Sequence, residues 1–486
     1  MSGCAQSRRD FLKLTGLVGA GLVIASPPLA PFRPWAGRVA ARAGASPWDE
    51  VPRILARIKP PVFPSQEFDV TKFGAVGNTT TDCTKAIADA IAACHAAGGG
   101  RVVVPSGTFL TGAIRLRSKV NLHVGEGAIL KFSQDPAKYL PVVFTRWEGT
   151  ELMNYSPFIY AFEETDVAVT GPGTLDGQAS DTAWWPWTGR ANLGWKAGGP
   201  IQTPDRTRLI EMATKGVPVA GRVFGEGHYL RPNFVQPYRC QNVLIEGVTI
   251  VNSPMWELHP VLCTNVTIRN VTVNSHGPNN DGCDPESCRD VLIDRCWFDT
   301  GDDCIALKSG RNDDGRRIGV PIENVIVRDC VMRDGHGGVT IGSEMTGGAR
   351  NIFAEGCRMD SPNLDRALRI KTNAVRGGTV ERVYMRNITV GQVAEALVTV
   401  DFYYEEGDKG AYTPTVRDIE VRNVTSKKSA YALLLRGYAR SPIADVRLVD
   451  CTFDNVAKPD VLECVKDLTL SNVKINGKVR NERITK

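Results

Sequence analysis

The sequence predicts an all-β protein, a right-handed single-stranded parallel β-helix with a helical cap at its N-terminal end. Two observations support this prediction. A short segment that alternates apolar and polar residues, the periodicity of a β-strand, recurs through the second half of the 486-residue chain. No helical run of useful length separates the copies, so strands joined through helices are not expected.

The repeated segment begins with Asn or Asp in nearly every copy, as in Asn242–Ile245. The copies begin at Asn242, Asn265, Asp290, Asn324, Asn351, Arg382, Asp418, Asp445 and Asp467. Successive first residues lie 22 to 36 positions apart, and such a period is typical of solenoids. Asn or Asp at a turn tolerates unusual backbone angles, which suits the turn before each strand. If each copy forms one coil and the coils stack in parallel, the fold is a β-helix.

A helix is expected before the first strands. Residues 81–94 have apolar side chains at helical spacing, Asp82 stands where a cap is needed, and glycines at 98–100 end the helix. Strand-like runs follow from Arg101 onward. A lone helix before many short strands suits a cap that covers the core of the first coil.

Residues 1–45 are typical of an export signal. Twin arginines, Arg8 and Arg9, precede a short apolar run, which indicates a Tat signal peptide; an ordinary Sec signal is the alternative. This segment holds six of the 58 Lys and Arg residues and one of the 53 Asp and Glu residues, which leaves 52 of each. The mature protein is therefore nearly neutral, and we expect a periplasmic or secreted protein with no nucleic-acid partner and no membrane contact.

The rest of the chain divides into an arm and one long domain. Residues 46–66 are rich in proline and are interpreted as an arm or linker, and residues 67–486 are expected to form the β-helix. An irregular insertion at about 176–232 contains tryptophans at 184, 185 and 187. Such long insertions are often functional, and these tryptophans either stack on sugar rings or pack the loop itself.

Thirteen cysteines are present, twelve of them after the signal. Their spacing fits no zinc site. Several follow the strand pattern at positions where other copies have valine, which indicates small buried residues. A protein folded in a reducing compartment before export needs no disulfide framework, so we expect at most one or two local disulfides.

Six titratable or charged side chains are expected to lie in one row: Asp281, Asp302, Asp303, His336, Arg369 and Lys371. The first acid precedes the acid pair by 21 and 22 residues, His336 follows Asp303 by 33, and Arg369 follows His336 by 33. These spacings approximate one coil each, and neighbouring strands stack about 4.8 Å apart. Arg369 and Lys371 flank an apolar residue, so both project from the same face.

This row allows several interpretations. Three carboxylates suit glycoside hydrolysis, calcium binding or a structural turn network. Hydrolysis needs one protonated and one ionised carboxyl, about 6.5–9.5 Å apart for inversion, and crowding of like charges raises the pKa of one member. Two cations on the same face favour an anionic substrate such as a uronate; alternatively, they only neutralise the acids.

The motifs Asn280-Asp281, Gly301-Asp302-Asp303, Gly335-His336-Gly337 and Arg369-Ile370-Lys371 resemble the four signatures of the glycoside hydrolase family 28 polygalacturonases. The resemblance covers about residues 67–480. One departure is Asn279-Asn280-Asp281, where many members have Asn-Thr-Asp. The resemblance implies a pectate-lyase-like solenoid that acts on pectic polysaccharide or oligogalacturonate by inversion, without metal or cofactor.

By the same resemblance, Asp302 is the general acid, and Asp281 with Asp303 activates water. His336 tunes or orients the acid, and Arg369 and Lys371 hold the substrate carboxylate. We also expect Asn280, Tyr403 and His259 to bind substrate, and Trp256 and Glu344 to shape subsites, with packing as the alternative for those off the motifs.

Rival functions remain at this stage. They are an endo-polygalacturonase, a rhamnogalacturonan or xylogalacturonan hydrolase, a polysaccharide lyase that uses calcium, and a non-catalytic carbohydrate-binding β-helix. The insertion at 176–232 is expected to close one end of the substrate groove. A closed end favours trimming from a terminus, so an exo-acting enzyme is the preferred interpretation.

Overall fold

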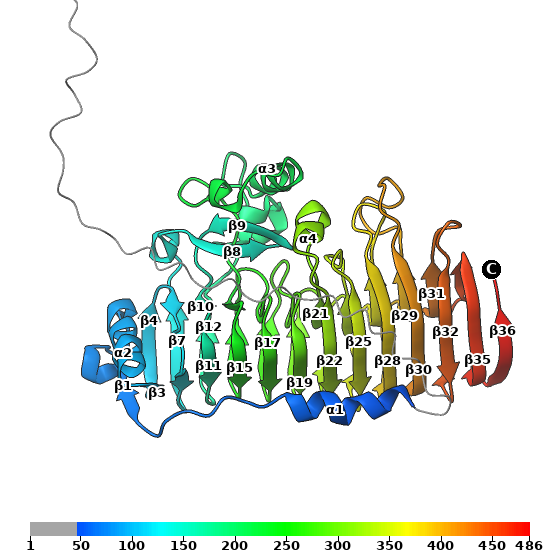
Figure 1. The fold of residues 1–486 in the computed structure, drawn as a ribbon, viewed down its shortest axis with the longest axis horizontal. Helices are drawn as coiled ribbons and strands as arrows, with labels where there is room; N and C mark the ends of the chain where they lie inside the picture. Colours follow the sequence, from blue (N-terminus) through cyan, green and yellow to red (C-terminus); the bar gives the residue numbers. More distant parts are fainter. Residues whose placement is uncertain (1–45) are drawn as a thin grey trace, which may run out of the picture. The chain divides into compact units, whose positions relative to one another are not determined.

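The computed structural model describes residues 46–486, and the expected signal peptide at residues 1–45 lies outside the described residues. The described part is a right-handed parallel β-helix, the predicted fold class. Its strands stack coil upon coil (Figure 1). No helix in residues 46–486 is long and apolar enough to span a membrane.

One stack of parallel strands contains every copy of the repeated segment. In spatial order its strands are β1 (Glu67–Asp69), β3 (Gly100–Val104), β6 (Val120–Val124), β11 (Thr165–Thr170), β15 (Gln241–Glu246), β17 (Thr264–Arg269), β19 (Arg289–Asp294), β22 (Ile322–Arg328), β25 (Ala349–Glu355), β28 (Thr379–Val390), β30 (Thr415–Ser426), β32 (Ile443–Val449) and β35 (Val465–Ile475). Strand β36 (Lys478–Ile484) pairs with β35 in the antiparallel direction and ends the stack.

A second stack follows the first around each coil. It comprises β2 (Asn78–Asp82), β4 (Gly107–Thr111), β7 (Ala128–Phe132), β12 (Thr174–Asp176), β16 (Thr249–Val251), β18 (Thr272–Ser275), β20 (Trp297–Thr300), β23 (Val331–Met332), β26 (Arg358–Met359) and β33 (Thr452–Phe453). The long strands β28, β30 and β35 take part in both stacks.

A third stack carries the candidate site, and we call its outward surface the site face. Its strands are β5 (Ile114–Arg115), β10 (Ile159–Phe162), β14 (Val235–Tyr238), β21 (Ile305–Leu307), β24 (Val339–Ile341), β27 (Arg366–Lys371), β29 (Ala396–Asp401), β31 (Tyr431–Arg436) and β34 (Val461–Glu463). Single bridges through Leu258 and Cys283 join β14 to β21.

The first residue of each repeated segment adopts the left-handed backbone conformation. The φ angles of all nine lie between 51° and 60°, a region that Asn and Asp occupy more readily than other non-glycine residues. Their side chains also bond from coil to coil, as Asn265 does to Asn242 (2.7 Å) and Asn351 to Asn324 (2.8 Å). The predicted unusual backbone angles at these positions are confirmed.

The interior is a continuous apolar core to which the cysteines contribute. Eleven of the twelve described cysteines are buried, and all twelve are free thiols. Those of successive coils stack, since the backbone N–H of Cys240 lies 3.4 Å from Cys263 Sγ and that of Cys263 lies 3.4 Å from Cys288 Sγ. The expected one or two local disulfides are therefore absent from residues 46–486.

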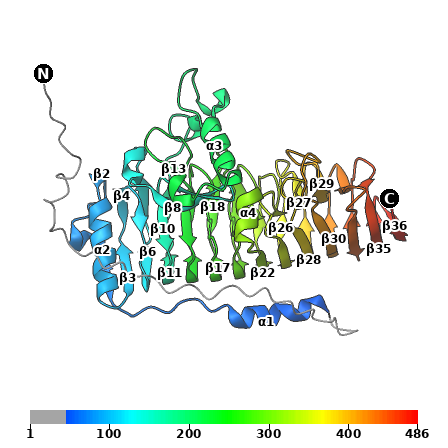
Figure 2. The same cartoon turned by 45° about the horizontal axis from the view of Figure 1, so that its top comes forward.

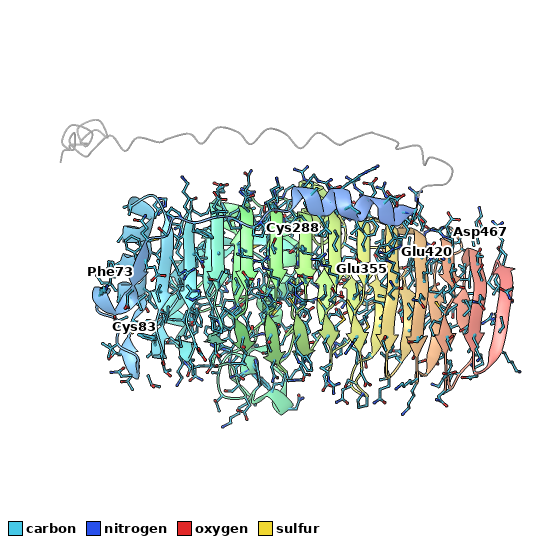
Figure 3. The ribbon with its side chains drawn as sticks, turned by 90° about the horizontal axis from the view of Figure 1, so that it is seen from below. Phe73, Cys83, Cys288, Glu355, Glu420 and Asp467 are labelled. Atoms are coloured by element: carbon cyan, nitrogen blue, oxygen red, sulfur yellow. The ribbon has the colours of Figure 1, made fainter. Side chains whose placement is uncertain are left out.

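Two helices cover parts of the coils. Helix α2 (Thr84–Ala96) contributes Ala86, Ile87, Ala90, Ile91 and Cys94 to the core beside β1 and β3. Helix α1 (Glu50–Arg57), in the proline-rich arm, runs across the outside of the first stack (Figures 2 and 3). Its apolar side packs on one side chain from each of four strands: Leu292, Ile326, Phe353 and Tyr384.

A small layer lies over the N-terminal part of the site face (Figure 1). It contains a hairpin, β8 (Val143–Trp147) and β9 (Thr150–Asn154), with β13 (Val223–Phe224), α3 (Thr203–Thr214) and α4 (Asn312–Ile318). The expected insertion also contains short 3-10 turns at Trp185–Thr188, Ala191–Leu193 and Val219–Gly221. The hairpin lies outside that insertion and was not predicted.

Candidate active site

Acidic residues of successive coils meet at the N-terminal end of β21, as the spacing predicts. Cys283 pairs with Ile305, so Asp281 and Asp303, each two residues earlier, lie on neighbouring coils. One oxygen from each of Asp281, Asp302 and Asp303 lies within 4.8 Å of the other two. These three oxygens therefore lie nearer to one another than 6.5 Å, the lower end of the carboxyl separation given for inversion, because Asp281 and Asp303 stand on adjacent coils.

Glycine is required beside these acids. A Cβ on Gly301 would lie 2.3 Å from the carbonyl oxygen of Gly277, and one on Gly335 would lie 2.6 Å from that of Asp302. Gly335 also has a φ of 151°. The glycines of the second and third motifs thus allow consecutive coils to approach at the acids.

Asp303 is the most strongly neutralised of the three acids. It is fully buried and contacts Lys371 Nζ at 2.7 Å, Arg369 Nη1 at 3.1 Å and Thr340 Oγ1 at 2.9 Å. Burial alone would raise its pKa, but Lys371 and Arg369 outweigh burial and hold the pKa of Asp303 below the ordinary value. This carboxylate is ionised at neutral pH.

Asp302 forms a pair with His336. His336 Nδ1 lies 3.1 Å from Asp302 Oδ1, and the imidazole is half exposed while the carboxylate is mostly covered. This hydrogen bond raises the pKa of His336. Burial raises the pKa of Asp302, but the bond to His336 prevails and lowers it below the ordinary value. The pair shares one proton between two adjoining groups.

Asp281 is the acid whose pKa rises. Its side chain is buried, Oδ1 has no hydrogen-bond partner among the described residues, and Oδ2 lies 3.6 Å from Lys308 Nζ. Burial and the nearby charge of Asp302 raise the pKa of Asp281 to about 8. The expected effect of crowded carboxylates is present, although it falls on Asp281 and not on Asp302, the acid implied by the family resemblance.

Lys308 is a site residue that the sequence analysis missed. It is buried, and its ammonium lies 3.5 Å from Asp284 Oδ1 and 3.3 Å from Glu344 Oε2. The ring of Trp256 lies beneath it, 4.3 Å from Nζ to the ring centroid. The register would have revealed it, since Lys308 pairs with Glu286 and stands three residues after Ile305 on the site face.

The two cations of the fourth motif project from the same face, as predicted. Arg369 and Lys371 both contact Asp303, and Tyr404 lies against them, with its ring centroid 5.7 Å from Arg369 Cζ and 5.2 Å from Lys371 Nζ. The two cations therefore neutralise Asp303. Arg369 remains partly exposed and has the planar fork that matches a carboxylate.

Two of the residues that were expected to bind substrate, Asn280 and His259, have buried side chains. Asn280 is fully buried and bonds internally to Ser253, Met255, Ser275 and Gly277. His259 is also fully buried, with Nε2 2.8 Å from Glu286. These two are corrections, because neither side chain reaches the surface.

Tyr403 is exposed but, within residues 46–486, makes no ring contact with Arg369 or Lys371, so its binding of substrate stays a prediction. Its ring packs against Tyr438 and lies 4.9 Å from Arg436 Cζ on the next coil. The neighbouring residue, Tyr404, is the one that faces the cations. Alternate residues point to opposite sides of an extended chain, so a shift of one residue changes the neighbours completely.

The residues expected to shape subsites are mostly packed. Trp256 is buried, and Glu344 is buried against Lys308 and Arg311, whose charges lower its pKa despite burial. Trp184 is buried in the core, with edge-to-face ring contacts to Tyr139 and Phe158. For these three side chains, packing is the interpretation that the structure supports.

Trp185 lies at the margin of the site. It is partly exposed and donates a hydrogen bond to the Ser253 carbonyl (2.9 Å), and its indole occupies the space beside Gly277. Gly277 in turn adjoins Gly301 of the second motif. Of the tryptophans in the insertion, this one adjoins the motifs.

The β8–β9 hairpin covers the N-terminal part of the site face. Arg146 on β8 is fully buried and contacts Glu286 Oε1 at 3.0 Å, and its carbonyl accepts hydrogen bonds from Asn233 and Gln236 (both 3.2 Å). Gln236, His259 and Glu286 have no exposed area. Towards the C-terminal end the site face is open, since the side chains of Arg436 and Glu463 are 37% and 52% exposed.

An ion-pair network fastens this layer to the coils next to the site. Arg311 contacts Glu148 in the hairpin turn (2.9 Å) and Glu405 in the loop after β29 (3.3 Å). Arg206 of α3 contacts the same Glu148 (2.7 Å), and Arg376 contacts the same Glu405 (2.6 Å). Residues far apart in the sequence therefore form one wall beside the acids.

Within residues 46–486, two groups of side chains have the donor spacing of a cation site. One is the cluster of Asp281, Asp302 and Asp303, where Arg369 and Lys371 already supply positive charge. The other is His276, Asp299 and Asp334, at the surface of neighbouring coils, with His276 Nε2 3.2 Å from Asp299. Hydrogen bonds to Ser361 and Asn363 occupy Asp334.

Comparisons with known proteins agree with this geometry. The family model described as "Glycosyl hydrolases family 28" matches residues 224–478, and one described as "Rhamnogalacturonase A/epimerase, pectate lyase-like" matches residues 68–139. The chain is 46% identical to a solved exopolygalacturonase from Thermotoga maritima, with a TM-score of 0.88 over 90% of this chain and 98% of that one.

Curated relatives are more distant. A "Probable polygalacturonase" from Vitis vinifera is 29% identical over 79% of this chain and 74% of that protein. An "Exo-poly-alpha-D-galacturonosidase" from Dickeya chrysanthemi is 27% identical over 74% of this chain and 62% of that protein.

Proposed function

The chain belongs to the glycosyl hydrolases family 28, a family of inverting glycoside hydrolases, and we propose that it cleaves the α-1,4 bond between galacturonates in pectin or its oligomers. The observation that supports this most is the grouping of three carboxylates with two cations and one imidazole on the site face. The acids suit glycosidic cleavage and the cations suit a uronate.

The proposed mechanism assigns the leaving-group proton to the pair of Asp302 and His336. With His336 protonated, the pair holds one proton at Nδ1, 3.1 Å from the carboxylate. A sugar that covers the half-exposed imidazole removes water from it, which favours the neutral pair, with the proton on Asp302. Asp302 then donates the proton to the glycosidic oxygen.

Water activation is assigned to Asp281 and Asp303. Asp303 stays ionised beside its two cations and orients the water, and Asp281, when ionised, accepts the proton. Attack from the face opposite the leaving group inverts the anomeric carbon. Arg369 and Lys371 hold the substrate carboxylate beside the bond that breaks.

NMR of the first-formed anomer on polygalacturonate tests this function. We expect the α-linked substrate to yield the β-anomer first, with no unsaturated product. Formation of the retained anomer, or no release from any galacturonate, would contradict the proposal. An unsaturated, calcium-dependent product would instead indicate a lyase.

We also propose that the enzyme trims galacturonate from a chain end. The covered N-terminal part of the site face and its open C-terminal part support this, as does the likeness to exo-acting relatives. Product analysis early in digestion tests it. Monomer alone is expected, whereas a spread of oligomers with a rapid loss of viscosity would indicate cutting within the chain.

Export is proposed to use the Tat route, which carries folded proteins. Twelve described cysteines without a disulfide are compatible with folding in a reducing compartment. Replacing Arg8 and Arg9 by lysine is expected to leave the active enzyme in the cytoplasm. Normal export of that variant would indicate the Sec route.

A further inference from the structure

Lys308 is a buried cation that three acids share: Asp281, Asp284 and Glu344. Its side chain is 2% exposed, and Nζ lies within 3.6 Å of Asp281, 3.5 Å of Asp284 and 3.3 Å of Glu344. It also donates to the carbonyl of Gly342 (3.3 Å). A lysine this deeply buried is stable only where carboxylates surround it.

The supply of positive charge to these acids is small. Arg311 also contacts Glu344, at 3.4 Å. For Asp281 and Asp284, in contrast, Lys308 makes the only ion pair found within residues 46–486. Three of the four carboxylate oxygens of these two aspartates have no hydrogen-bond partner there. Both acids therefore depend on one ammonium group.

We infer that Lys308 is a positioning residue that keeps Asp281 able to accept the proton of the attacking water. The inference rests on the proposed function, in which Asp281 acts as the base. Lys308 lies outside the four motifs, and its Nζ lies 3.6 Å from Oδ2 of the proposed base.

The charges around Asp281 explain why a dedicated cation is needed. Asp302 and Asp303 face Asp281 and oppose its ionisation. Asp284 and Glu257 also adjoin it, and the charge of Asp281 in turn raises the pKa of each of them. Lys308 and the more distant Lys371 favour its ionisation, and Lys371 is already paired with Asp303. Without Lys308, Asp281 would hold its proton up to a higher pH than it does with Lys308, and a protonated carboxyl cannot act as the base.

The experiment compares the pH dependence of kcat/KM on an oligogalacturonate for the wild type and three variants. Lys308→Met removes the charge and keeps the length, and Lys308→Arg keeps the charge. Glu344→Gln removes a competitor for Lys308 that does not take part in the reaction. The control is Arg417→Gln. Arg417 lies on β30 and forms an exposed ion pair with Glu381 on β28.

The expected shifts have opposite signs. Activity falls on the acid side as the base becomes protonated, so Lys308→Met moves this limb to higher pH by about one unit or more, because an opposite charge at this distance has that effect. Lys308→Arg largely restores the wild-type limb. Glu344→Gln moves it to lower pH, since Lys308 then acts more fully on Asp281. Arg417→Gln leaves the profile unchanged.

Other outcomes overturn the inference. An equal loss at every pH in Lys308→Met, or shifts of the same sign in Lys308→Met and Glu344→Gln, would mean that Lys308 only supports the fold. If Lys308→Met does not fold, the sign of the Glu344→Gln shift decides. A wild type inactive on every galacturonate contradicts the proposed function itself, whatever the variants do.

Discussion

Three aspartates within 4.8 Å of one another differ in charge because each has a different partner. Asp303 contacts two cations, Asp302 contacts an imidazole, and Asp281 shares one lysine with other acids. Residue type alone cannot give this order. The charge of each carboxylate follows from its neighbours, and the division of roles follows from the charge.

The first prediction concerns the pair of Asp302 and His336. Asp302→Asn removes the carboxylate that raises the pKa of His336, so this pKa is expected to fall back towards 6.5. Loss of the proposed acid should also reduce kcat by several orders of magnitude while binding largely survives. NMR titration of the imidazole and steady-state kinetics measure the two effects. An unchanged His336 pKa would contradict the pairing.

A second prediction concerns the hold on the uronate. Arg369→Ala removes one charge-assisted contact, worth about 1.5–3 kcal/mol, so KM for oligogalacturonates should rise roughly tenfold or more. Lys371 keeps Asp303 neutralised, so part of kcat remains. Arg369→Lys, which lacks the fork, should fall between the two. If affinity is the same in Arg369→Ala and the wild type, the arginine does not hold the substrate.

At this scale the sequence predicted which residues meet, but not always which way they point. Coil spacing was enough to bring Asp281, Asp303 and Arg369 together, because a solenoid converts sequence distance into stacking. It could not show that Asn280 is consumed by internal hydrogen bonds or that Tyr404, not Tyr403, faces the cations. Those facts depend on loop paths between the strands.

Among the elements, the β8–β9 hairpin decides how the site face is used. Its two strands belong to no repeat, so the repeat pattern does not predict the hairpin. One local signal was present, since Glu148 and Gly149 form a two-residue turn with φ angles of 41° and 77°, which is typical of a hairpin. The closed end was expected from residues 176–232. These residues do contact the coils, as Trp185 does at the Ser253 carbonyl, but the hairpin, which was not predicted, also covers the coil surface through Arg146.

The third prediction tests how the hairpin is held. Burial would raise the pKa of Glu286, but Arg146 and His259 lower it below the ordinary 4.5. A lowered pKa contributes stability above about pH 4.5, and this stability is lost as pH falls through the folded value. Glu286→Gln should therefore destabilise the protein at neutral pH by about 3 kcal/mol, and less in acid.

Denaturant unfolding at pH 7 and below pH 4 measures this difference. Hydrogen exchange should locate the loss in residues 143–154. Glu381→Gln, at an exposed ion pair on β28, is the matched control and should change stability by less than about 1 kcal/mol. A difference between Glu286→Gln and the wild type that does not depend on pH would contradict the assigned charge.

At the scale of the whole molecule, stacking takes the place of cross-links. Each coil buries apolar side chains against the coils on either side, and polar ladders such as Asn265 to Asn242 join the turns. The fold class and the position of the site along it followed from the repeat. The layer above the site did not, because its contacts are specific to this chain.

The fourth prediction follows from the free thiols. Alkylation of the denatured protein without reduction should label all twelve cysteines after the signal, and a reducing agent should leave Tm unchanged. Mass spectrometry with and without prior reduction checks this. A pair of cysteines that is labelled only after reduction would contradict it.

Helix α1 has a practical consequence for making the protein. It covers Leu292, Ile326, Phe353 and Tyr384, which would otherwise form an apolar stripe on four adjacent strands. A shortened chain that begins at the first coil would leave this stripe in water, where such surfaces favour self-association. A protein expressed for assay should therefore keep the sequence from Pro47 onward. Without this segment, we expect the protein to lose solubility.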